Sequence, residues 1–75
     1  MEYQRDNSES KHQFIEVPFE TGGDARLRLT YINETNSVRI NKVISGAGPY
    51  PGPEPELSKI PLIIEALIKI YNDFH

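Results

Sequence analysis

The 75-residue chain contains no cysteine and only two histidines, His12 and His75, which stand near opposite ends of the sequence. The lack of cysteine excludes disulfides and thiolate metal ligands, which often stabilise very short chains. Two distant histidines do not make a metal site. The sequence therefore predicts no metal and no cofactor, and oligomerisation is the remaining way for so small a domain to enlarge its core.

An excess of basic residues is also missing, because eight Lys and Arg against eleven Asp and Glu give a net charge of −3. This balance argues against generic binding to nucleic acid or to anionic membranes. The first residues are polar, with no apolar leader, and Glu65 and Lys69 interrupt the last apolar run before it is long enough to span a bilayer. We therefore expect a cytoplasmic protein without membrane contact.

Candidate catalytic groups are few and isolated. Ser8 and Lys11 have the Ser-x-x-Lys spacing of some acyl-enzymes, but no supporting motif accompanies them. Asp73 and His75 offer two metal ligands at most, at the end of the chain. We therefore expect no enzyme, and an active site built across a dimer seam is the one enzymatic alternative.

Hydrophobic periodicity divides the chain into a tail and one folded domain. Residues 1–12 are polar and without periodicity, so they are predicted to be a disordered tail. Residues 13–75 are predicted to form a single α+β domain. Its predicted elements are strands at about 14–19, 25–32 and 37–43, a Gly/Pro-rich loop at 45–56 and a helix at about 57–74.

The loop lengths set a register for the three strands. Pairing Phe19 with Ala25, and Ile32 with Ser37, places Glu16 opposite Arg28. It also gathers one apolar face, made of Ile15, Val17, Leu27, Leu29, Tyr31, Val38 and Ile40. The predicted fold is a three-stranded antiparallel β-meander packed against one C-terminal α-helix (βββα) through this face.

Two residues refine the expected sheet. Pro18 has no N–H to donate to a ladder, so its strand is predicted to lie at an edge, with the second strand central. Lys42 points toward the apolar side of the opposite edge, opposite Leu27. A charge directed inward at an edge opposes pairing with another sheet.

The predicted helix is apolar over more of its circumference than one sheet can cover. One stripe follows helical spacing: Ile60, Ile63, Ile64, Leu67, Tyr71 and Phe74. Further apolar residues flank it: Leu62, Ala66 and Ile70 on one side and Ile68 on the other. The apolar arc spans roughly 200°, against the ~100° that a one-sided helix needs.

These flanking residues indicate association. Leu62, Ala66, Ile68 and Ile70 are predicted to contact a second copy of the chain or a protein partner, and the small Ala66 lets two backbones approach closely. The alternative is that the N-terminal tail or the proline loop covers them. A homodimer or an accessory subunit of a larger complex is the favoured function.

The opposite sheet face suggests a second function. Arg26, Arg28 and Arg39 share it with the aromatic Phe14, and such a surface can grip a nucleic-acid backbone and stack a base. A solvated face whose arginines pair with Glu16 and its neighbours is the simpler interpretation, given the net negative charge.

The Gly/Pro-rich loop has two interpretations as well. Prolines at alternate positions, 49, 51, 53 and 55, favour polyproline II and predict a stiff crossover rather than a helix or a ladder. The alternative is a docking segment recognised by a protein partner, made of Pro49, Tyr50, Pro51 and Pro53.

Overall fold

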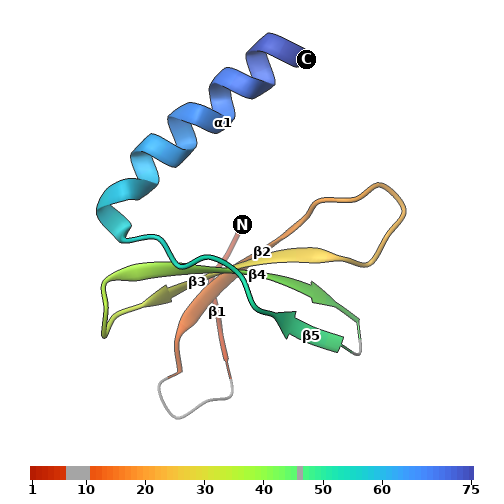
Figure 1. Ribbon diagram of the computed structural model, residues 1–75. Helices are drawn as coiled ribbons and strands as arrows, with labels where there is room; N and C mark the ends of the chain where they lie inside the picture. The colour runs from red at the N-terminus through yellow and green to blue at the C-terminus, as the bar shows by residue number, and fades with distance from the viewer. Residues whose placement is uncertain (7–10, 46) are drawn as a thin grey trace.

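The computed structural model describes residues 1–6, 11–45 and 47–75 of the chain. It is an α+β protein with one antiparallel sheet and one C-terminal helix (Figure 1). The five strands follow chain order in the sheet: β1 (Gln4–Arg5), β2 (Gln13–Pro18), β3 (Arg26–Ile32), β4 (Ser37–Ile44) and β5 (Ala47–Tyr50). A 3₁₀ turn, η1 (Leu57–Lys59), leads directly into α1 (Ile60–Phe74).

The predicted register of the three central strands is confirmed. Glu16 pairs with Arg28, Leu27 with Lys42, and Ile32 with Ser37. Ile15, Leu29 and Ile40 form one row on the apolar face, as alternation required. The β3–β4 turn is closed by Asn36, which has a positive φ of 50° and accepts a hydrogen bond from the Tyr31 hydroxyl at 2.7 Å.

Within residues 1–6, 11–45 and 47–75 the sheet has five strands, so the prediction of three was wrong at both edges. Gln4–Arg5, within the predicted disordered tail, pairs with the first half of β2; residues 7–10 of that tail lie outside the described residues. Pro18 ends β2 beyond the reach of β1, so its missing N–H interrupts no ladder although β2 is not an edge strand.

The proline-rich segment adds the other edge. Ala47–Tyr50 pairs with β4 around a register shift between Lys42 and Ile44. The chain then continues along β4, where the N–H groups of Ile40 and Val38 donate to the carbonyl oxygens of Pro53 and Pro55, each at 2.9 Å. Proline lacks a donor but keeps its acceptor, and the prediction that this segment could not join a ladder overlooked that acceptor.

The helix lies where the sequence predicted but does not cover the sheet. Pro61 falls in its first turn, where a missing N–H breaks no helical bond, and Lys59 occupies the N-cap position. Figure 1 shows α1 diverging from the sheet, and no Cα atom of α1 lies within 8 Å of a Cα atom in the described strands. The predicted packing of the helix against the apolar face is therefore absent in one copy. No helix in the described part of the chain is long and apolar enough to cross a membrane.

Candidate interaction surface

Helix α1 is open to solvent around its whole circumference. Only Ile60 and Ile63 are half-buried, and no residue of the helix is buried. Large apolar side chains are exposed on all sides except the charged one: Leu62, Ile64, Leu67, Ile68, Ile70, Tyr71 and Phe74. The stripe expected to face the sheet is as exposed as its flanks, with Leu67 61% and Leu62 60% exposed.

The four predicted contact residues do not form one row. Helical geometry places Leu62, Ala66 and Ile70 one turn apart along one side. Ile68 lies beyond the charged strip that contains Glu65 and Lys69, and Lys69 is bonded to Asp73 at 2.9 Å. The contact surface predicted from the sequence is therefore the row of three, adjoining the stripe, with Ile68 on the stripe's far side.

The apolar face of the sheet is open too. We use this name for Ile15, Val17, Leu27, Leu29, Tyr31, Val38 and Ile40. Six of these side chains are half-buried and Tyr31 is exposed. In a two-layer fold, a sheet face of this composition would be fully buried beneath the second layer, because branched aliphatic side chains are the usual interior residues. The apolar face therefore lacks the layer that a two-layer fold requires.

The opposite face, which we name the arginine face, is the better covered one. It contains every buried residue of the described strands: Phe14, Thr30, Ile32, Ser37 and Asn41. The guanidinium of Arg28 lies 4.2 Å from the centre of the Phe14 ring and binds Glu16 through Nε at 2.9 Å and Nη2 at 2.8 Å. The Nδ2 of Asn41 donates to the carbonyl of Tyr50 at 2.8 Å.

This coverage affects the predicted nucleic-acid residues. Phe14 is 6% exposed beneath Arg28, so it can stack a base only if Arg28 moves. Arg28 and Arg39 are engaged with Glu16 and Glu54, the latter pair at 2.7 Å. Arg26 is exposed at the end of β3. The sheet therefore brings Phe14 and the three arginines to one face, as predicted, but two of the three guanidinium groups are in ion pairs.

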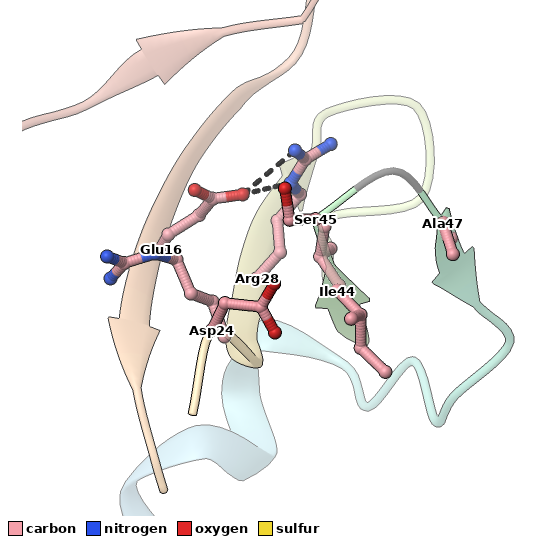
Figure 2. A pocket seen from close by; sticks show the side chains of 9 residues that line it. Glu16, Asp24, Arg28, Ile44, Ser45 and Ala47 are labelled. Atoms are coloured by element: carbon pink, nitrogen blue, oxygen red, sulfur yellow. Dashed lines mark hydrogen bonds and ion pairs between the residues drawn. The ribbon is translucent and has the colours of Figure 1, made fainter. Parts of the chain in front are cut away.

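An open pocket of about 590 Å³ adjoins this face at the β4–β5 turn (Figure 2). Its charged lining consists of Glu16, Asp24, Arg26 and Arg28, and Glu16 and Arg28 neutralise each other there. The sequence did not predict this pocket, because Ala47 and Gly48 join its lining only through the pairing of β5 with β4. Among the described residues, no three His, Asp or Glu side chains cluster closely enough to hold a metal ion.

The proline segment is fixed to the sheet as well as exposed. Pro49, Tyr50, Pro51 and Pro53 all face solvent, with Tyr50 44% exposed. The carbonyls of Tyr50 and Pro53 are already engaged by Asn41 and Ile40. A peptide-binding partner would therefore reach the side chains and only one edge of the backbone.

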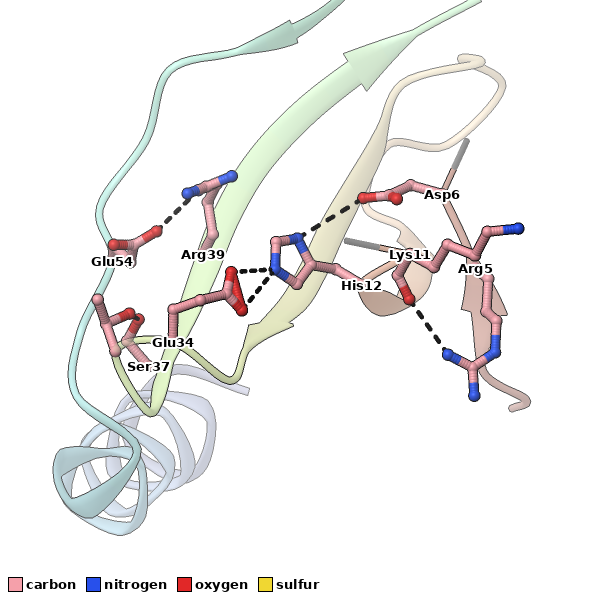
Figure 3. A network of polar contacts seen from close by, with 9 residues as sticks. Arg5, Asp6, Lys11, His12, Glu34, Ser37, Arg39 and Glu54 are labelled. Carbon is pink, nitrogen blue, oxygen red and sulfur yellow. Dashed lines mark hydrogen bonds and ion pairs between the residues drawn. The ribbon is translucent and has the colours of Figure 1, made fainter. Parts of the chain in front are cut away.

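A polar contact that the sequence did not predict joins the N-terminal segment to the β3–β4 turn (Figure 3). His12 Nε2 lies 2.7 Å from Glu34 Oε1, and its Nδ1 lies 3.8 Å from Asp6 Oδ2. The hydrogen bond from His12 lowers the pKa of Glu34, and the charges of His12 and Arg39 act in the same direction. Only the antiparallel pairing brings residues this far apart in sequence together.

Comparison with known proteins gives no assignment: no protein-family model, curated protein or solved structure matches this chain.

Proposed function

We propose that this protein is a small, non-enzymatic protein-interaction module that associates through α1, as a homodimer or as an accessory subunit. The observation that carries the proposal is the exposure of seven large apolar side chains on a helix whose Cα atoms all lie more than 8 Å from those of the described strands. Exposed apolar patches of this extent mark association surfaces in soluble proteins.

Composition supports the same function. The chain has no cysteine and carries no catalytic motif, and its 75 residues provide only a small core within one copy. A homodimer supplies the missing burial without any further chain. The lack of cysteine also suits a cytoplasmic location, where disulfides are rare.

Nucleic-acid binding through the arginine face remains the second candidate, and it receives less support. Its aromatic residue is buried and two of its arginines are in ion pairs. A salt-dependent shift with an oligonucleotide, lost in an Arg26→Glu variant, would favour it, since phosphate contacts are weakened by salt.

The test of the main proposal is the solution mass over a range of concentrations, by size exclusion with light scattering. We expect twice the 8.6 kDa of the chain. Leu62→Glu and Ala66→Glu should each shift the population toward monomer, because they place a charge within an apolar contact. Asn72→Glu, on the polar strip of the same helix, is the matched control and should leave the mass unchanged.

A mass of 8.6 kDa at every concentration would contradict the homodimer. Equal effects of Ala66→Glu and Asn72→Glu would contradict the assignment of the contact to the Leu62, Ala66 and Ile70 side of α1.

A further inference from the structure

The chain carries two apolar surfaces that match each other and do not meet. The stripe on α1 and the apolar face of the sheet are the two halves of one expected core, and both are open in a single copy. Their dimensions agree, since fifteen helical residues span about 22 Å. Seven residues of β3 span about 23 Å.

The connection between the two surfaces holds them apart. The chain before α1 is bonded to β4 at Ile40 and Val38, and the N–H of Leu57 then donates to the carbonyl of Asn36 at 2.9 Å. Gly52 is the last glycine before the helix, and η1 continues into α1 without an intervening loop. Backbone hydrogen bonds at the β3–β4 turn therefore fix the point from which η1 and α1 leave the sheet. Folding the helix back onto its own sheet would require the chain to bend sharply at this last bond or within η1.

We propose that two copies exchange their helices, so that α1 of each lies across the apolar face of the other copy's sheet. This inference rests on the proposed homodimer and assigns the surface that each helix meets. The stripe containing Leu67 packs on the partner's sheet. The row of Leu62, Ala66 and Ile70 meets the partner's helix, which explains why the apolar arc is twice as wide as one contact needs.

The buried area suits such a dimer. Seven apolar side chains, each about half exposed or more, offer roughly 700 Å² per helix. Two helices and the two sheet faces beneath them then bury about 2,000 Å² or more, which is the range of permanent dimers. The exchange is also self-complementary, as a two-fold dimer requires, because each copy gives one helix and receives one.

The natural absence of cysteine permits a direct test by cross-linking. A tagged Leu67→Cys chain and an untagged Leu29→Cys chain are coexpressed and mildly oxidised. These positions are central in α1 and β3, so they meet whichever way the helix crosses the strands. We expect a mixed covalent dimer, severalfold more abundant than with Arg39→Cys, the matched control on the arginine face.

The same two cysteines in one chain separate exchange from self-packing. Exchange predicts that the Leu29→Cys, Leu67→Cys double variant forms covalent dimers. A disulfide within one chain, at monomer mass, would show the helix folded onto its own sheet and overturn the inference.

A measurement on the unaltered sequence guards against misfolded variants. In a sample mixing isotope-labelled and unlabelled chains, intermolecular NOEs should connect methyl groups of α1 with those of Leu27, Leu29, Val38 or Ile40. A dimer with contacts only between helices would overturn the exchange and leave the proposed function standing. A monomer would overturn both the exchange and the proposed homodimer, and of the proposed function only an accessory subunit of a larger complex would stand.

Discussion

The two faces of the sheet reverse the usual relation between polarity and burial. The arginine face holds every buried residue of the described strands, because Arg28 lies over Phe14 and the ion pairs with Glu16 and Glu54 cover its surface. The apolar face, with its leucines and isoleucines, is half open. Polar side chains can cover their own face, since the long aliphatic part of an arginine side chain reaches across neighbouring strands. Branched aliphatic side chains cannot, and they need a second layer from elsewhere.

The largest effect should come from the apolar face. Leu29→Ala is expected to cost about 2–5 kcal/mol, the range for truncating a covered core leucine, and the cost should shrink at protein concentrations low enough to dissociate the parent dimer. Urea unfolding followed by circular dichroism at two concentrations measures it. Arg26→Ala, exposed at the end of the same strand, should stay within about 0.5 kcal/mol of the parent.

Leu67→Ala tests whether α1 covers the apolar face in the dimer. Leu67 lies on α1, which approaches no described strand within one copy, so its truncation can affect the sheet only through a partner. Its cost should be of the same size as that of Leu29→Ala, and the two changes together should cost less than their sum, as expected for residues in contact. Costs that add fully and do not depend on concentration would show that the apolar face stays half open in solution.

The next effect concerns the segment that holds the two surfaces apart. A Cβ atom at Gly52 would collide with the carbonyl oxygen of Ile40, whose position is fixed within β4. Gly52→Ala should therefore loosen the ladder between β4 and the prolines, at a cost of about 1–3 kcal/mol. Amide hydrogen exchange should speed up at Ile40 and Val38, which donate to this segment.

Gly23→Ala is the matched control for Gly52→Ala. A Cβ there approaches mainly the carboxylate end of Glu20, which is flexible and can move away. Unchanged exchange at Val38 and Ile40 in Gly52→Ala would show that the ladder between β4 and the prolines does not depend on the close approach of Gly52 to Ile40.

The same segment shows where prediction from the sequence stopped. Alternation and turn lengths were enough to predict the register of β2, β3 and β4, since a slip of one residue would reverse both faces. The edges were missed because Gln4–Arg5 is too short to show periodicity, and because proline was judged by its missing donor alone. The exposed row on α1 was expected, but the open apolar face was not, since a departure point for the helix that is fixed by backbone bonds leaves no local pattern in the sequence.

A smaller effect is expected on the arginine face. Arg28→Lys keeps the charge but loses the planar group that lies over Phe14 and binds Glu16 through two nitrogens. We expect a loss of about 1 kcal/mol, given the part-buried ion pair and the cation–π contact. Thermal unfolding measures this loss. The dimer mass should remain unchanged, because the arginine face takes no part in the proposed exchange. A change in mass would move the interface to this face.

The smallest effect is the pH response of the contact between the N-terminal segment and the β3–β4 turn. The pKa of Glu34 is lowered in the fold by its hydrogen bond from His12, so the ionised carboxylate stabilises the native state. This contribution is fully present above the ordinary glutamate pKa of about 4.3 and is lost as the pH falls through the lowered value. In a carboxyl NMR titration, His12→Gln should move the Glu34 transition upward, toward the ordinary value. His75→Gln should not, since His75 stacks on Tyr71 at the other end of the chain. An unchanged Glu34 transition in His12→Gln would show that the hydrogen bond from His12 does not lower the pKa of Glu34 and so does not contribute to the stability of the fold.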